Sequence, residues 1–416
     1  MTDLSRAYAA LLDAEDPIAS LRDAFVNDDP ELIYLDGNSL GRLPKATTER
    51  VARVVREEWG ADLIRSWDHW VDLPARAGDL IGEALLGAAA GQVAVSDSTT
   101  VNLYKLAVAA LDARPDRTVI VTDDDNFPTD RYVLEGLAAQ RGLELRVVRT
   151  DIDKGLDLDV LRDAVGEDTA LVSLSHVAYR SGALLDMAAV NEIVHGAGAL
   201  VLWDLCHSAG AVPVRLDATG ADLAIGCTYK YLGGGPGAPA FLYVRQELQR
   251  RLRQPIWGWF GQRDQFAMGP SYDPVPGIDR FLVGTPAVLG IAAVEEGVRL
   301  LAEAGIERLR AKGVALTGYV IDLAREWLPE LDLATPADPE RRGSHVSLRH
   351  PEAWRLTQAL IAAKVIPDYR TPERLRLGPA PISTSFTDVW DGLDRLRRIV
   401  ADRSYEGFSS EPSRVT

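Results

Sequence analysis

Cysteine and histidine are scarce in this chain of 416 residues, which contains two cysteines and six histidines. The cysteines, Cys206 and Cys227, are too few for a disulfide framework and too far apart for a metal cluster of the usual spacing. We therefore expect two reduced, buried thiols. The histidines show no HExxH spacing, so zinc-dependent hydrolysis has no supporting motif and we expect no bound metal.

Long apolar runs and an excess of positive charge are also missing. No run reaches the length of a membrane span, and the first residues lack the layout of a secretory signal, so we expect a cytoplasmic protein. The net charge of −16 argues against nucleic acid as a general partner, because proteins that bind it usually carry a basic face. The length suffices for two domains of ordinary size.

Two phosphate-binding motifs are absent as well. No Gly-x-x-x-x-Gly-Lys-Ser/Thr run occurs, so phosphoryl transfer of the P-loop kind has no support. The glycine-rich run Gly233–Gly237 contains Pro236 and is not followed by an obvious helix start. It therefore does not match the GxGxxG pattern, and a dinucleotide-binding fold is disfavoured.

Lysine is rare too, with six residues against 39 arginines. Lys230 stands beside the glycine-rich run, whose glycines let the backbone pass close to a ligand. A lysine amine can lose its proton and form a Schiff base, whereas a guanidinium stays protonated. Taken alone, Lys230 is more typical of a solvated turn and Tyr229 of a packing residue. In a cofactor site, Tyr229 would position the cofactor or relay a proton.

Asp204 ends an apolar run and precedes Lys230 in the chain. An acid at the carboxyl end of a strand can keep a pyridine nitrogen protonated, which lets the ring of pyridoxal phosphate accept electrons. A carboxylate that caps the next turn is an equal alternative for Asp204 alone, and His207 alone is more typical of a structural histidine than of a cofactor contact. Together, Asp204 and Lys230 indicate a pyridoxal-phosphate enzyme.

Two further segments are candidates for cofactor contacts. Ser96–Asn102 precedes an apolar helical pattern, and the hydroxyls and N–H groups of a helix start form either an anion site for the cofactor phosphate or a plain N-cap. Asp125–Asp130 follows a strand candidate. Phe127 in this segment can stack on a pyridine ring, although an aromatic residue near a proline turn more often belongs to the core.

The middle of the chain alternates short apolar runs with helical patterns. This predicts an α/β fold with a largely parallel sheet, covered on both faces, and with ligands at the carboxyl ends of the strands. The expected strands are 119–122, 143–148, 170–174, 199–203, 223–226 and 240–244. Helical patterns at 289–304 and 306–327 and a strand at 344–348 predict a smaller α+β domain. We expect an N-terminal segment at 1–50 packed on the small domain, a large domain at 51–290 and the small domain at 291–416.

Several motifs together resemble one enzyme family. They are Tyr34–Gly41, Ile64–Trp67, Ser98–Asn102, Phe127–Asp130, Trp203–Gly210, Thr228–Leu232, Trp257–Phe260, Phe281–Pro286 and Arg374–Arg376. Through these runs most of the chain resembles the kynureninase family, pyridoxal-phosphate enzymes of fold type I in the aminotransferase class V superfamily. The resemblance implies the three-layer fold of that class and a homodimer with the active site at the subunit interface.

The resemblance also implies roles for single residues. Lys230 matches the lysine that binds the cofactor covalently, and Asp204 matches the partner of the pyridine nitrogen. The other implied cofactor contacts are Ser98, Thr99, Thr100, Phe127, Asp130, His207 and Tyr229, with Trp259 and Thr285 reaching the site across the dimer interface. Arg376 matches the arginine that pairs with the substrate carboxylate, for which its forked guanidinium is suited, and Asn38 and Ser39 are expected beside the substrate. The alternatives are a core tryptophan, a helix-capping threonine and a surface arginine.

Two positions depart from the family pattern. Most relatives have asparagine where this chain has Gly233, and lysine where it has Arg180. Neither departure removes a chemical role, and the role of His69 stays open.

The implied activity is hydrolysis of L-kynurenine or 3-hydroxy-L-kynurenine to anthranilate or 3-hydroxyanthranilate and L-alanine, in tryptophan catabolism or de novo NAD biosynthesis. One alternative is another class V enzyme, an aminotransferase or a desulfurase. A desulfurase needs a mobile cysteine, whereas both cysteines lie within three residues of Asp204 or Lys230. A second alternative is a cofactor-binding protein without activity, which should lack the lysine, the acid or the arginine.

Overall fold

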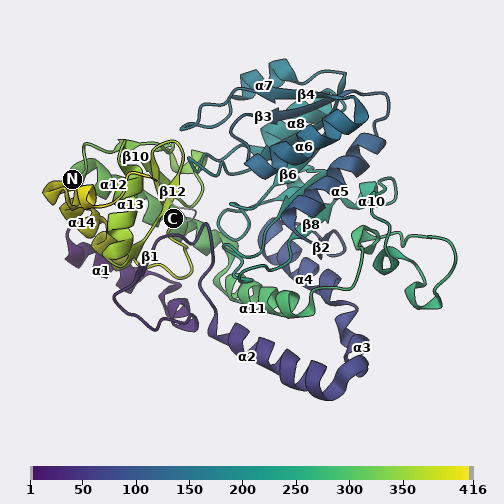
Figure 1. Cartoon of the computed structure of the whole chain (residues 1–416), viewed down its shortest axis with the longest axis horizontal. Coiled ribbons are helices and arrows are strands. Elements are labelled where there is room, and N and C mark those ends of the chain that lie inside the picture. The colour runs from purple at the N-terminus through teal and green to yellow at the C-terminus, as the bar shows by residue number, and fades with distance from the viewer. Residues whose placement is uncertain (1–2, 412–416) are drawn as a thin grey trace.

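The computed structural model describes residues 3–411, in which a seven-stranded sheet is flanked by helices (Figure 1). The strands of the chain are β1 (Ile33–Tyr34), β2 (Val93–Val95), β3 (Val119–Asp123), β4 (Glu144–Val148), β5 (Thr169–Ser175), β6 (Leu200–Asp204), β7 (Leu223–Gly226), β8 (Phe241–Val244), β9 (Asp332–Leu333), β10 (Val346–Arg349), β11 (Val365–Ile366), β12 (Asp368–Arg370) and β13 (Arg374–Leu377). The large sheet has the order β2-β8-β7-β6-β5-β3-β4. All pairs from β7 to β4 are parallel, and β8 runs antiparallel to β7 and β2. The predicted α/β fold with a largely parallel sheet is confirmed.

Helices cover both faces of this sheet. The helices are α1 (Arg6–Glu15), α2 (Lys45–Arg53), α3 (Trp67–Trp70), α4 (Leu73–Ile81), α5 (Thr99–Asp112), α6 (Pro128–Arg141), α7 (Leu158–Ala164), α8 (Met187–Gly196), α9 (Leu216–Thr219), α10 (Gln246–Gln249), α11 (Val288–Ala304), α12 (Ile306–Trp327), α13 (Ala353–Ala362) and α14 (Phe386–Asp402). In β6, Leu200 and Leu202 share a core with α5 and α6, whereas Val201 and Trp203 share a core with α8 and α11. Side chains alternate between two buried faces, which is why the strands read as continuous apolar runs.

A smaller unit lies beside the sheet (Figure 1). It contains an antiparallel sheet of order β12-β13-β10-β9, packed with α12, α13 and α14. The N-terminal segment packs on this unit. Its strand β1 pairs in parallel with β11, and the Trp390 indole donates a hydrogen bond to the Leu4 carbonyl at 2.8 Å. These contacts bring residues from both ends of the chain together.

The division of the chain at residues 50 and 290 stays a prediction, and one helix argues for a different second boundary. Ile291, Val294 and Val298 of α11 lie in the core of the large sheet, not in the core of the smaller unit. We therefore propose that the small domain begins near Gly305, between α11 and α12.

The helical patterns at 289–304 and 306–327 are confirmed, because α11 and α12 span nearly those residues. The helical segment from α2 to α4 has no counterpart among the predicted elements. Its first helix continues into a π-helical stretch at Val54–Asp62, where the apolar periodicity of an α-helix is interrupted. No helix within residues 3–411 combines the length and apolar character needed to cross a membrane.

Candidate active site

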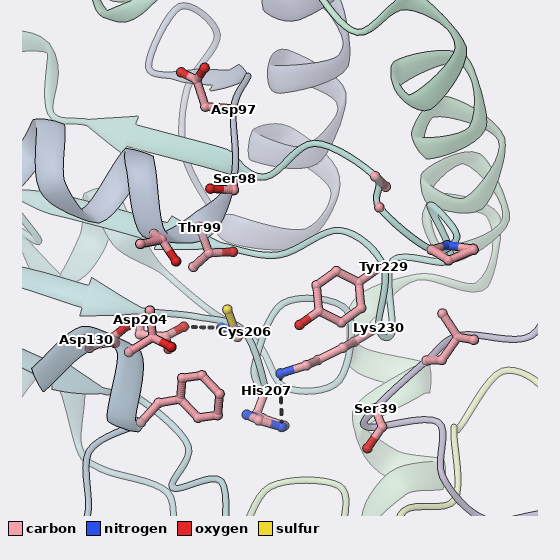
Figure 2. A pocket seen from close by; sticks show the side chains of 17 residues that line it. Ser39, Asp97, Ser98, Thr99, Asp130, Asp204, Cys206, His207, Tyr229 and Lys230 are labelled. Carbon is pink, nitrogen blue, oxygen red and sulfur yellow. Dashed lines mark hydrogen bonds between the residues drawn. The ribbon is translucent and has the colours of Figure 1, made fainter. Parts of the chain in front are cut away.

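A cavity of about 710 Å³ opens at the carboxyl edge of the large sheet. Segments that follow β2, β3, β6 and β7 line it, so four strand ends bring together residues that are far apart in sequence. The predicted site residues in its wall are Ser39, Ser98, Thr99, Thr100, Phe127, Asp130, Asp204, His207, Tyr229 and Lys230. The structure thus places ten of the predicted residues around one space (Figure 2).

Lys230 differs from the other buried lysines in its partners. Lys105 and Lys312 are buried in ion pairs, with Asp97 at 2.6 Å and Asp16 at 2.7 Å. Within residues 3–411, no ion pair joins Lys230 to a carboxylate, and its Nζ lies 3.3 Å from Nε2 of His207. Of these three buried lysines, Lys230 is therefore the one without a salt bridge to an acid in the described part of the chain.

The His207 imidazole is buried beside the Lys230 amine. Burial, followed by the charge of Lys230, holds the pKa of His207 well below its ordinary value. A neutral ring can accept a hydrogen bond from the ammonium, and Figure 2 shows this contact inside the cavity. His207 can thus orient the Lys230 side chain without adding a second positive charge.

Two acids stand together on the opposite wall. Asp204 is the last residue of β6, and its Oδ1 accepts a hydrogen bond from the Cys206 backbone N–H at 2.6 Å. Burial and the charge of Asp204 raise the pKa of Asp130 well above its usual range. Of the two neighbouring acids, Asp130 is therefore the one whose burial favours the protonated form. A pyridine ring with a protonated nitrogen would give Asp204 a cationic partner.

The start of α5 forms a third part of the wall. Ser98 caps this helix, with its Oγ accepting from the Val101 N–H at 3.3 Å. Thr99 and Thr100 follow in the first turn, where backbone N–H groups have no partner within the helix. The neighbouring Asp97 carboxylate is paired with Lys105. The helix start is thus suited to an anion such as a phosphate.

These features fit pyridoxal phosphate. The cavity offers an anion site at α5, an acid for a ring nitrogen, a buried lysine in Lys230, and the Phe127 ring in the wall. Among residues 3–411, the buried Oδ2 atom of Asp130 has no hydrogen-bond partner, so this oxygen beside Asp204 is available to a bound ligand. Tyr229 adds a phenol that points into the same space (Figure 2).

The predicted substrate arginine lies behind the cavity wall. Arg376 is only 1% exposed, so the alternative of a surface arginine is wrong. Its guanidinium already forms an ion pair with Asp368 and donates to Ser39 Oγ at 3.0 Å. The side-chain oxygen of Asn38, with its amide in the orientation that satisfies both groups, accepts from Arg376 Nε at 2.9 Å. Of these groups, Ser39 alone reaches the cavity.

Two predicted residues are not near Lys230 in the single chain. Trp259 is 37% exposed and packs edge-on against Phe260 and Phe266. Thr285 lines a separate apolar hollow of about 580 Å³. Their place in a site shared by two subunits stays a prediction. His69 is also remote and lies 3.2 Å from Glu58.

Sequence reasoning missed several residues of the site. They are Leu40, Asp97, Thr129, Cys206, Pro236 and Ala238, which line the cavity, and Asp368, which pairs with Arg376 behind it. All of the lining residues except Ala238 lie within the motifs described above, so their proximity to the predicted residues was the available signal. No sequence pattern marks Asp368.

Gly41 gives a testable link between the N-terminal segment and Lys230. Its N–H donates to the Tyr229 carbonyl at 2.9 Å, and a Cβ at this position would overlap the Lys230 carbonyl oxygen. We expect Gly41→Ala to lower the melting temperature by about 5 °C or more and to weaken cofactor binding, because the overlap is with backbone. Thermal unfolding and cofactor titration measure both effects. Gly136→Ala in α6, where a Cβ meets nothing within 4 Å, is the control and should not destabilise; equal stability of both variants would contradict the account.

Comparisons with known proteins agree with this site. Residues 309–396 match the family model of the kynureninase C-terminal domain, and residues 83–215 match that of the DegT/DnrJ/EryC1/StrS aminotransferase family. The chain is 47% identical over 405 residues to a kynureninase from Pseudomonas fluorescens, and 46% identical over 406 residues to one from Burkholderia pseudomallei strain 1106a. Both alignments cover 95% of each chain.

Solved structures agree on the fold. A cysteine desulfurase from Thermococcus onnurineus superposes with a TM-score of 0.78 at 19% identity, covering 94% of this chain and 98% of that one. A cysteine desulfurase from Escherichia coli gives 0.79 at 17% identity, with 94% and 99% covered. At such identities the likeness shows the three-layer fold alone, as predicted. The sequence identity of 46–47% to kynureninases over 95% of the chain is stronger evidence than the shared fold, and it shows that this chain belongs to the kynureninase family.

Proposed function

We propose that this chain is a pyridoxal-phosphate-dependent hydrolase that cleaves the Cβ–Cγ bond of L-kynurenine or 3-hydroxy-L-kynurenine. The products are anthranilate or 3-hydroxyanthranilate and L-alanine. The observation that carries the proposal is the meeting of Lys230 and Asp204 in one cavity of a chain in this family. Such an enzyme would serve tryptophan catabolism or NAD biosynthesis, and we place it in the cytoplasm.

The first task of the chain is to hold the cofactor. Asp204 would bind the ring nitrogen, Phe127 would cover a ring face and the start of α5 would bind the phosphate. When bound, pyridoxal phosphate supplies a ring that takes up the electron pair left by removal of a proton from the substrate α-carbon. Lys230 would anchor the cofactor at rest, and its displaced amine would remove that proton at Nζ.

The second task is to return a proton after the carbon–carbon bond breaks. Water adds to the γ-carbonyl of the substrate, and its oxygen leaves in the carboxylate of the aryl acid. Burial raises the pKa of Tyr229 above its ordinary value, so the phenol keeps its proton at neutral pH. Tyr229 Oη or Lys230 Nζ would then donate to the substrate β-carbon, which becomes the methyl group of alanine.

The third task is to orient the substrate. Arg376 would pair with the substrate carboxylate, with Ser39 as the group that links the cavity to the guanidinium. This requires Arg376 to share its charge between Asp368 and the substrate. Asn38 would hold the guanidinium from its other edge.

The proposal is tested by its two products. Purified protein with pyridoxal phosphate and either kynurenine should form the aryl acid and alanine in equal amounts. A keto acid without alanine would favour an aminotransferase instead. Sulfide released from cysteine would favour a desulfurase, although Cys206 and Cys227 are both buried, with the Cys227 N–H 3.2 Å from Cys206 Sγ.

A homodimer is part of the proposal. Trp59, which lines the same hollow as Thr285, is 59% exposed, and Leu63 and Ile64, a few residues further along the chain, are 60% and 76% exposed. We expect a particle of twice the 45.3 kDa chain mass in sedimentation. Ile64→Asp should yield monomers and lower activity, because an interface would bury the new charge. Val160→Asp on α7, 39% exposed before substitution, is the control and should stay dimeric; a monomeric wild-type protein with full activity would contradict the proposal.

A further inference from the structure

Tyr179 contacts two parts of the candidate site that lie far apart in sequence. Its ring packs edge-on against Phe127, with the ring centroids 5.3 Å apart and the planes at 88°. Its carbonyl oxygen accepts a hydrogen bond from Nη1 of Arg376. One residue therefore touches both the aromatic expected at the cofactor ring and the arginine expected at the substrate carboxylate.

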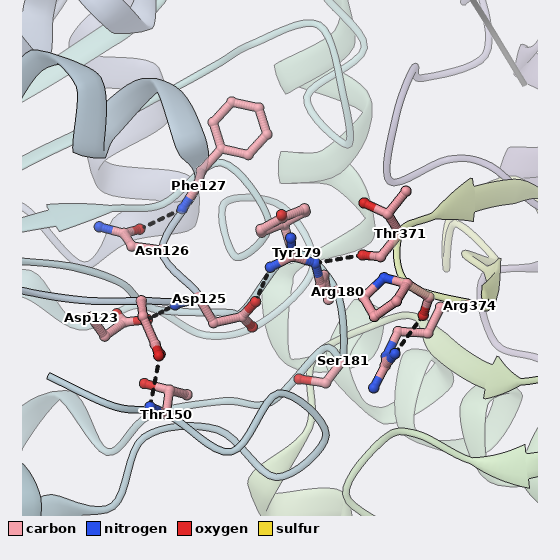
Figure 3. A network of polar contacts seen from close by, with 12 residues as sticks. Asp123, Asp125, Asn126, Phe127, Thr150, Tyr179, Arg180, Ser181, Thr371 and Arg374 are labelled. Carbon is pink, nitrogen blue, oxygen red and sulfur yellow. Dashed lines mark hydrogen bonds and ion pairs between the residues drawn. The ribbon is translucent and has the colours of Figure 1, made fainter. Parts of the chain in front are cut away.

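Arg180 holds Tyr179 from the other side. Its guanidinium lies 4.6 Å from the centroid of the Tyr179 ring, forms an ion pair with Asp125 and donates through Nε to the Thr371 carbonyl at 2.8 Å. Asp125 follows β3 of the large sheet, whereas Thr371 lies between β12 and β13 of the small one. Figure 3 shows Arg180 between Asp125 and Thr371, next to Tyr179.

The backbone of Arg180 is fixed as well. Its carbonyl oxygen accepts a hydrogen bond from Ser347 Oγ on β10, the neighbour of β13 in the small sheet. The side chain is 19% exposed and that of Asp125 is 5% exposed. These contacts span both sheets and are largely shielded from water, so they are stronger constraints than a surface ion pair.

We propose that Arg180 is a positioning residue that clamps Tyr179 between the two sheets, so that Tyr179 sets the place of Phe127 and of Arg376 relative to each other. The inference rests on the proposed function of the site. It assigns to Arg180 no contact with substrate. Its consequence is that loss of the guanidinium changes substrate binding more than the chemical step.

If Arg180 served only as a stabilising ion pair with Asp125, the kinetic result would differ from that of a clamp on Tyr179. A substitution at Asp125 distinguishes these two roles. Burial raises the pKa of Asp125 to about 6 even though Arg180 lowers it. Arg180→Gln leaves this buried acid without its cation and should destabilise the protein under either account. The double variant Arg180→Gln/Asp125→Asn removes both charges of this pair, so neither is left without its partner. Stability should therefore return, whereas the clamp on Tyr179 and the tie to Thr371 stay weakened.

The experiment measures steady-state kinetics with L-kynurenine, melting temperature and cofactor affinity for the wild type, both variants and Arg180→Lys. We expect Arg180→Gln and the double variant to raise KM about tenfold or more with kcat within about threefold, and Arg180→Lys to recover part of KM. The double variant should recover the melting temperature. Arg349→Gln, which removes an exposed pair with Asp332, is the control and should change none of these values.

A wild-type KM in the double variant, or in Arg180→Gln, would overturn the inference. Hydrogen exchange of residues 177–184 gives a readout that does not need catalysis, and it should speed up in both variants, with or without cofactor. If the wild-type protein fails to cleave kynurenine, the proposed function fails. Exchange and cofactor affinity then still test the clamp, and unchanged exchange in both variants would overturn it.

Discussion

Replacing Lys230 with alanine should reduce kynurenine hydrolysis by about 10⁴-fold or more while the fold is retained. The variant loses the amine that would anchor the cofactor and remove the α-proton, and no other lysine reaches the cavity wall in residues 3–411. The side chain makes one hydrogen bond, to His207, and no ion pair with a carboxylate among the described residues, so its removal breaks no salt bridge. Stability should therefore change little.

The measurement is the initial rate of aryl acid formation together with the melting temperature. Lys154→Ala is a matched control, because the Lys154 side chain is 79% exposed and lies in a surface ion pair with Asp151. It should keep the wild-type rate. A Lys230→Ala variant that retains the wild-type rate would refute the assignment of the catalytic lysine.

Replacing Asp204 with asparagine should lower kcat by about 100-fold or more, equivalent to about 2.7 kcal/mol of lost transition-state stabilisation. The amide has nearly the same shape, and its oxygen can still accept from the Cys206 N–H. It carries no negative charge, so it cannot hold a proton on the ring nitrogen, and the ring becomes a poorer electron acceptor. The loss should thus appear in kcat.

Asp130 provides the matched comparison, because it is a neighbouring acid whose replacement should lower kcat much less than that of Asp204. Burial and the charge of Asp204 raise the pKa of Asp130 well above its usual range, which favours the protonated form of Asp130. Asp130→Asn exchanges one neutral group for another and should cost less than about tenfold in kcat. Equal losses in both variants would contradict the assignment of the charge to Asp204.

Much of the large sheet was predictable, because its strands are short apolar runs between helical patterns. Thr169–Ser175 and Leu223–Gly226 are found where the runs predict strands. The reversed direction of β8 was not predictable, since a strand buried on both faces shows the same run in either direction. Nor does the sequence show which core α11 joins, because amphipathic periodicity reports a buried face but not its partner.

The site was predictable where its residues follow strand ends. Asp204, Ser98 and Phe127 come after strands of one sheet, so their convergence follows from the fold. Contacts between distant segments were not predictable. The contact of Arg376 with Ser39 and the packing of Tyr179 on Phe127 join residues of separate segments, and no spacing rule reports them.

The most direct test of the central claim locates the covalent bond to the cofactor. The holoenzyme is reduced with borohydride, digested and analysed by mass spectrometry. The account predicts about one pyridoxyl group per chain, on the peptide that contains Lys230. A pyridoxyl group on Lys105, Lys312 or a surface lysine in place of Lys230, or no covalent adduct at all, would contradict it.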